Sequence, residues 1–484
     1  MSRSPTTRST EIREQLGHPV IDGDGHIIEM LPLFVDFIRD HGRGDIVENA
    51  AIFNMVRRSA ADEAAMPMTA RRSAALVPAT WTIPTDTDYF ATVTQPSRYY
   101  ERLGEAGIDF SVLYPTFGLP LLQIDDPDHR VTVCRLFNEW LAEEWRPYRD
   151  RFTVAAAVPL HTPEEAIAGL EHAKALGAKV VLIPSWVRRP RDADTFAGDD
   201  LERIRPSGFG YRGWLDTFGL DSAHDYDPVW AKAIELGLPL AVHSPGMGFD
   251  DRQSATNFTF NGVGHFAAAG VALAKSLFLG GVTRRFPDLR VAVLEGGVAT
   301  GVEAYVGLVG FWKKRGARGL DKLDPANLDF DRLGALYTER DPRLAQYSAR
   351  ALAAMVNGFS ERYDDFGAAG IDSVEDIRDQ WCRAFTWGCE ADDPLVGTAF
   401  DTRANPLGAR LPAIMGSDIG HWDVPEFDSP LAEAYELVEH GILDEAQLRE
   451  FLFTNSVDFY GALNPDFFAD TVIERDVAAA RTAS

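Results

Sequence analysis

This sequence has few cysteines, no long apolar run and a shortage of positive charge, and each absence removes a class of protein. Its three cysteines, Cys134, Cys382 and Cys389, cannot all pair with one another and lack the spacing of a zinc finger. No run of about 18 apolar residues occurs, so we do not expect a membrane-spanning helix. The 47 lysines and arginines face 73 aspartates and glutamates, and the net charge of -26 argues against nucleic acid or an anionic membrane as a partner.

What remains is the composition of a large globular protein. Hydrophobic residues make up 45% and charged residues 25% of the 484 positions, enough for an extensive core. The first residues lack the apolar segment of a secretory signal, so we expect a cytoplasmic protein in a reducing compartment. We expect a disordered N-terminal tail over residues 1–17, a folded unit over 18–462 and a C-terminal tail over 463–484.

Short apolar runs alternate with helical patterns along the chain, which is typical of a parallel α/β protein. The runs predict eight strands, at 20–29, 108–114, 152–158, 179–183, 238–242, 291–294, 383–387 and 413–417. Eight strand–helix units predict a (β/α)8 TIM barrel. Long insertions follow strands 1, 4, 6 and 7, the first three at about 30–100, 184–226 and 311–380, and we expect them to form a cap over the mouth.

Four of these runs end in an imidazole or a carboxylate. Asp24 and His26 end the first run, two residues apart and therefore on one face, and His243, Glu295 and Asp418 follow three later runs. An Asp-x-His pair alone fits an ordinary hydrogen-bonded couple as well as a metal site. Because the carboxyl ends of barrel strands meet at one mouth, the convergence of four such ends favours a metal site.

The same motifs carry a family resemblance. Asp-x-His at 24–26, His243, a polar residue before Gly296-Gly297 and Gly-Ser-Asp at 416–418 resemble the amidohydrolase superfamily, in its branch related to aminocarboxymuconate semialdehyde decarboxylase. The segments 261–267, 294–297, 388–394 and 416–425 resemble a subgroup of longer chains, which includes a nonheme diiron monooxygenase of platensimycin and platencin biosynthesis. Relatives commonly carry histidine where Asp24 and Glu295 stand.

The resemblance and the residue types together imply a ligand set. The expected metal ligands are Asp24, His26, His243, His265, Glu295, Asp418 and His421. Carboxylates in place of imidazoles suit iron or manganese better than catalytic zinc, and carboxylates bridge metal pairs. We therefore expect two ferrous ions, with a single Zn²⁺ or Mn²⁺ as the alternative.

Some members of this set have a second interpretation. His265 also suits the start of a helix, His421 also suits a supporting position beside a ligand, and Glu295 also suits acceptance of loop amides. Asp22 shares the face of Asp24 but lies deeper, so we expect it to orient a ligand.

An arginine-rich segment bears on the substrate. Six arginines fall in the insertion after strand 4, namely Arg188, Arg189, Arg191, Arg203, Arg205 and Arg212. Arg188 and Arg189 are the candidates for binding the phosphates of a coenzyme A handle. The alternative is that neighbouring acidic residues neutralise these arginines on the surface.

The first functional expectation is a nonheme diiron monooxygenase with no catalytic residue beyond its metal ligands. The resemblance implies that it uses dioxygen and an external reductase to hydroxylate an unactivated carbon of a bulky, coenzyme A-linked terpenoid in antibiotic biosynthesis. The alternative is a metal-dependent hydrolase or nonoxidative decarboxylase with His243 or Asp418 as base. A noncatalytic binding protein is disfavoured, and a homo-oligomer is left open.

Overall fold

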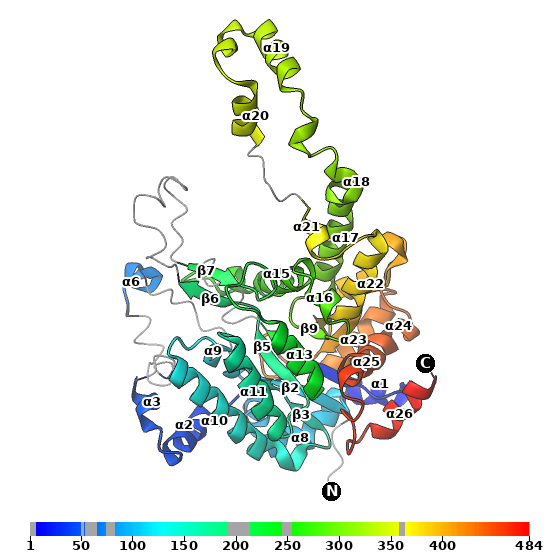
Figure 1. Cartoon of the computed structure of the whole chain (residues 1–484). Helices are drawn as coiled ribbons and strands as arrows, with labels where there is room; N and C mark the ends of the chain where they lie inside the picture. Colours follow the sequence, from blue (N-terminus) through cyan, green and yellow to red (C-terminus); the bar gives the residue numbers. More distant parts are fainter. Residues whose placement is uncertain are drawn as a thin grey trace.

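Eight parallel strands form the centre of the molecule (Figure 1). The computed structural model describes residues 6–49, 53, 65–73, 83–190, 213–243, 254–357 and 364–483. The strands are β1 (Ile21–Ile27), β2 (Phe110–Pro115), one strand made of β3 (Phe152–Val154) and β4 (Ala156–Ala157), β5 (Val181–Pro184), β8 (Leu240–His243), β9 (Val291–Val293), β10 (Phe385–Glu390) and β11 (Ala413–Gly416). Each predicted strand is present, and the predicted α/β barrel architecture is confirmed.

The strands pair in two ladders that meet on both sides. One ladder has the order β1-β2-β3 and the other the order β11-β10-β9-β8-β5-β4. The Ala155 N–H donates to the Leu113 carbonyl at 2.9 Å and the Ala156 N–H to the Val180 carbonyl at 3.1 Å, so one strand belongs to both ladders. Across the other gap, the Asp418 N–H donates to the Asp24 carbonyl at 3.1 Å. The end of β11 therefore lies against β1.

Helices cover the outside of the strands. They are α10 (Pro127–Trp145), α11 (Pro163–Ala175), α13 (Asp227–Leu236), α15 (His265–Leu279), α16 (Val282–Arg285), α17 (Val298–Arg315), α22 (Val374–Ala384), α23 (Pro430–Glu439), α24 (Glu445–Arg449) and α25 (Asn455–Leu463). Side-chain caps define several starts, as where Thr162 accepts from the Glu165 N–H at 3.2 Å. The helices cover the outer face of the strands, and the packed barrel interior covers the inner face. Burial on both faces explains the continuous apolar runs of the strands.

Within the described part of the chain, one segment, Phe258–Leu279, is long and apolar enough to cross a membrane by length and composition. It is two helices, α14 (Phe258–Gly262) and α15, which are separated by an extended Val263 and a left-handed Gly264. Leu273 and Leu277 of α15 are fully buried against the barrel. One side of α15 is therefore buried, as is typical of a helix that packs on a protein core.

The insertions contain short helices and one hairpin. The first holds α2 (Leu31–Asp40), α3 (Gly44–Asn49), α6 (Met68–Ser73), α7 (Thr87–Val93) and α8 (Pro96–Arg102), and the second holds the antiparallel pair β6 (Val187–Pro190) and β7 (Gly213–Asp216). The third holds α18 (Ala317–Leu320), α19 (Phe330–Arg340), α20 (Ala349–Asn357) and α21 (Asp365–Ala368). In contrast to the expectation of a cap, α19 and α20 project away from the barrel (Figure 1).

The structure describes folded segments within both predicted tails. Helix α1 (Arg8–Gln15) packs on α23, with Ile12 buried and the Ser9 hydroxyl donating to the Asp428 carbonyl at 2.6 Å. At the other end, Phe467 and Phe468 are buried and are followed by α26 (Glu474–Ala483). These segments fold because each contributes apolar side chains to the core.

Candidate metal centre

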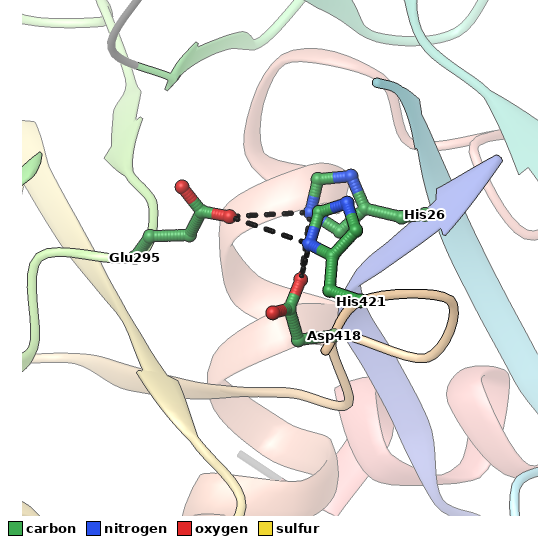
Figure 2. Close-up of side chains that lie close together, drawn as sticks. All are labelled: His26, Glu295, Asp418 and His421. Carbon is green, nitrogen blue, oxygen red and sulfur yellow. Dashed lines mark ion pairs between the residues drawn. The ribbon is translucent and has the colours of Figure 1, made fainter. Parts of the chain in front are cut away.

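The ends of three strands and one loop bring four predicted ligands together (Figure 2). The His26 Nε2 atom lies 3.1 Å from Oδ1 of Asp418 and 3.4 Å from Oε1 of Glu295. The His421 Nδ1 atom lies 2.5 Å from the same Asp418 oxygen and 4.0 Å from the same Glu295 oxygen. These four donor atoms form one group that faces a common centre.

A second group adjoins the first. Asp24, His26 and His243 form it, with 2.9 Å between Nε2 of His243 and Oδ1 of Asp24 and 3.7 Å between Nε2 of His26 and the same oxygen. The Nδ1 atom of His243 also lies 3.4 Å from Oε2 of Glu295. One oxygen of Glu295 therefore lies in the first group, and the other lies beside Nδ1 of His243, the ring nitrogen that does not face Asp24.

These residues fit divalent cations. The side chains of Asp24, Glu295 and Asp418 are 5% exposed, and those of the three histidines 1% or less. Among the described residues, no hydrogen bond reaches His26 Nε2, His243 Nδ1, Glu295 Oε2 or Asp418 Oδ1. Buried polar atoms are costly without a partner. Ligands at about 2.0–2.2 Å from an ion lie about 3 Å apart, which matches this cluster.

The carboxylates and imidazoles of the cluster stabilise one another's charged forms. Burial lowers the pKa of His243, but Asp24 and Glu295 outweigh burial and raise that pKa to about 9. Burial raises the pKa of Glu295, and His243 and His26 outweigh it, so that this carboxyl has a pKa well below its usual range. The imidazoles must lose their protons before they bind a metal.

The backbone is strained at two of the candidate ligands. Glu295 has φ 53° and Asp418 has φ 49°, both in the left-handed region that residues with side chains rarely occupy. Such strain costs on the order of 1–3 kcal/mol and concentrates at functional sites. Here it turns both carboxylates from the strand direction towards the shared centre.

Thr116 and Asp22 contact the candidate ligands on the side away from the cluster centre and hold them in position. The Thr116 hydroxyl lies 3.0 Å from Nε2 of His421 and 3.4 Å from Nδ1 of His26, which leaves the other nitrogen of each ring for the cluster. Asp22 accepts from the backbone N–H groups of Asp24 at 3.2 Å and Ser417 at 2.9 Å. A side chain at Gly25 would collide with the Asp22 carboxylate, so glycine is required there.

The structure keeps His265 apart from this cluster. His265 begins α15 and belongs to neither group of candidate ligands, and its ring centroid lies 5.9 Å from that of Phe260. Its place at the helix start matches the alternative interpretation drawn from the sequence. Cys389 is also not a ligand in either group; its buried sulfur accepts from the Val298 N–H at 3.2 Å.

Arg188 and Arg189, the two arginines proposed from the sequence to bind phosphates, differ in their surroundings. Arg189 donates to the buried Asp216 at 2.9 Å, to the His161 carbonyl at 2.6 Å and to Tyr226 at 2.7 Å, so its guanidinium anchors the hairpin. Arg188 is exposed and lies 5.9 Å from the centre of the Trp186 ring. Arg191, Arg203, Arg205 and Arg212 lie outside the residues that the structure describes.

A cavity of about 240 Å³ opens beside the cluster. Its lining includes three aromatic residues, Phe258, Phe266 and Trp422, and four acidic residues, Glu295, Glu390, Asp418 and Asp423. Burial and the neighbouring Asp418 raise the pKa of Asp423 to about 8. Sequence reasoning missed Asp423, although it lies within the segment 416–425, and missed Thr116, which no motif marks.

The chain belongs to the amidohydrolase family, whose family model matches residues 22–316. Members of this family are enzymes, among them hydrolases and decarboxylases, and the chain is therefore an enzyme of the amidohydrolase type.

Solved structures with a similar fold include two decarboxylases. A dihydroxybenzoic acid decarboxylase from Polaromonas sp. JS666, with bound manganese and 2-nitroresorcinol, is 14% identical over 93% of this chain and 99% of that chain, with a TM-score of 0.50. A 5-carboxyvanillate decarboxylase from Novosphingobium aromaticivorans DSM 12444, complexed with manganese, is 13% identical over 92% of this chain and 96% of that chain, with a TM-score of 0.46. At 14% identity the likeness to the first of these structures describes the fold alone. The expected oxygenase activity stays a prediction.

Proposed function

We propose that this protein binds two divalent cations and hydrolyses a small organic molecule. The observation that carries the proposal is the position of Glu295, between the two groups of candidate ligands: one oxygen lies 3.4 Å from Nε2 of His26 and the other 3.4 Å from Nδ1 of His243. A carboxylate in such a position is suited to bridge a pair of ions. The family, whose members include hydrolases, supports the type of reaction.

The residues divide by role. Asp24 and His243 would hold one ion, His421 and Asp418 the other, Glu295 both, and His26 either one of them, because its Nε2 lies in both groups. When bound, such ions lower the pKa of water and polarise a substrate carbonyl. Asp423 shares a hydrogen bond with Asp418 and lines the cavity, so it is placed to hold a proton for the leaving group.

The size of the cavity favours a small substrate. Drug-sized ligands occupy pockets of about 300–1,000 Å³, whereas the described cavity measures about 240 Å³. A cavity of about 150 Å³ holds benzene. A substrate with one substituted ring therefore fits better than the bulky terpenoid expected from the sequence.

Metal analysis of the purified enzyme tests the two-ion site. We expect two ions per chain in protein loaded with Mn²⁺ or Fe²⁺, and about one in Glu295→Ala, because the variant lacks the group that faces both positions. Glu339→Ala, which removes an exposed carboxylate on α19, is the matched control and should keep two ions. One ion per chain in all three proteins would contradict the two-ion site.

A second candidate function follows from the ligand types. Three carboxylates and three imidazoles form a hard ligand set, which suits iron and hence the diiron monooxygenase expected from the sequence. Oxygen uptake by iron-loaded, chemically reduced protein, with a hydroxylated product, supports this candidate. Turnover of a hydrolysable substrate without oxygen, or release of carbon dioxide from a carboxylated one, supports the hydrolase or the decarboxylase instead.

A further inference from the structure

The cavity beside the cluster has an aromatic wall. The rings of Phe258, on α14, and Trp422, in the loop after β11, meet edge to face with centroids 5.0 Å apart and an interplanar angle of 86°. Phe266 lines the cavity from the first turn of α15. Aromatic faces attract organic cations, since the ring quadrupole is negative above and below the plane.

The cavity lining also includes acidic residues that are not candidate metal ligands. Glu390, the last residue of β10, and Asp423 line the cavity and belong to neither group of candidate metal ligands. Asp418, a candidate ligand whose side chain is 5% exposed, also lines the cavity. The described lining includes no lysine or arginine.

The balance of charge disfavours an anionic substrate. Two divalent cations would exceed the charge of the three candidate carboxylate ligands, Asp24, Glu295 and Asp418, by a single unit. Burial and the neighbouring carboxylates raise the pKa of Glu390 well above its usual range in the metal-free protein. Bound divalent cations would oppose that shift and favour the ionised Glu390 carboxylate, which would offset that unit. In the described cavity a substrate carboxylate would then face the Glu390 carboxylate with no lysine or arginine beside it, whereas an ammonium group could pair with Glu390.

We propose that this cavity selects an organic cation, an amine or amidine attached to an apolar group, with its charge towards Glu390 and its apolar part against Phe258 and Trp422. The inference rests on the proposed function, because it takes Glu295 and Asp418 to be engaged by metal ions. Aromatic and acidic groups together are what recognition of such a cation requires. Glu390 is then a residue that determines specificity.

Calorimetric titration of the metal-loaded enzyme with benzylamine, benzyl alcohol and benzoate tests the proposal. We expect benzylamine to bind at least about tenfold more tightly than benzoate, with benzyl alcohol between them, since charge-assisted contacts are the stronger ones. Glu390→Gln should remove most of the preference for benzylamine over benzyl alcohol. Glu339→Gln removes the same charge at an exposed site on α19 and should leave all three affinities unchanged.

The outcomes separate this proposal from the two-ion hydrolase. Benzoate binding as tightly as benzylamine, no binding of benzylamine, or an unchanged preference in Glu390→Gln would overturn the proposal. A Glu390-dependent preference for benzylamine in protein found to hold fewer than two ions would support the cation site while contradicting the two-ion site.

Discussion

Asp22 and Ser417 join the first and last strands of the barrel directly beneath the candidate metal centre. The Ser417 N–H donates to Oδ1 of Asp22 at 2.9 Å, and the Ser417 hydroxyl donates to Oδ2 at 2.8 Å. The Ser111 hydroxyl on β2 donates to the same Oδ2 at 2.6 Å. One buried carboxylate therefore joins three strands and holds the backbone of Asp24 and of Ser417, the residue before Asp418.

Replacing Asp22 by alanine should destabilise the barrel and weaken metal binding. The variant leaves several buried donors without an acceptor, so we expect a loss of about 3–5 kcal/mol in the free energy of unfolding, measured with urea. Asp36→Ala, which removes a 69% exposed carboxylate on α2, should change it by less than about 0.5 kcal/mol. Equal stability of the two variants would mean that the Asp22 network contributes nothing.

Two histidines that the sequence left undecided should respond differently to substitution. His421→Ala removes a nitrogen 2.5 Å from Asp418 Oδ1, and we expect the affinity for Mn²⁺ to fall at least about 100-fold, more than for a typical supporting residue. His265→Ala should keep the affinity of the wild type, because His265 lies in neither ligand group. A loss of affinity in His265→Ala would place that residue in the metal site after all.

The sequence predicted the candidate ligands where a simple geometric rule applies. Asp24, His26 and His243 follow apolar runs, and the carboxyl ends of parallel strands converge, so their meeting was predictable. Nothing in the sequence indicates the left-handed backbone of Glu295, or that the Thr116 hydroxyl lies 3.0 Å from His421. Those features depend on how separate loops pack, which periodicity does not contain.

The affinity for metal should depend on pH because the cluster holds protons when it is empty. Asp24 and Glu295, opposing burial, raise the pKa of His243 to about 9, whereas an unfolded histidine titrates near 6.5. The protonated His243 should thus stabilise the metal-free protein fully below about pH 6.5. This stabilisation should be lost as pH rises through about 9.

Metal binding follows the opposite trend. Each proton displaced from the cluster makes the apparent affinity for Mn²⁺ rise about tenfold per pH unit, so affinities measured at pH 7 and pH 8 should differ by that factor or more. Proton release on binding, measured by calorimetry in two buffers of different ionisation enthalpy, is the accompanying check. Affinity that is constant over this range would mean that the imidazoles are already neutral.

Helix α1, in the region expected to be a disordered tail, should contribute measurably to stability. Thr7 caps it, and the Ser9 hydroxyl both donates to the Asp428 carbonyl at 2.6 Å and accepts from the Ala432 N–H at 3.1 Å. Ile12 is the apolar side chain that α1 buries, and it is 7% exposed. The amino end of the chain is thus attached to α23 by both polar and apolar contacts.

Ile12→Ala should therefore lower the free energy of unfolding by about 2 kcal/mol, the lower end of the range for deleting a buried aliphatic side chain. Glu14→Ala, an exposed position on the same helix, is the matched control and should leave the urea midpoint unchanged. The expected difference arises because the alanine at position 12 leaves a void in the core, whereas the alanine at position 14 faces solvent. Identical unfolding curves for the two variants would show that residues 8–15 do not pack on α23 in solution.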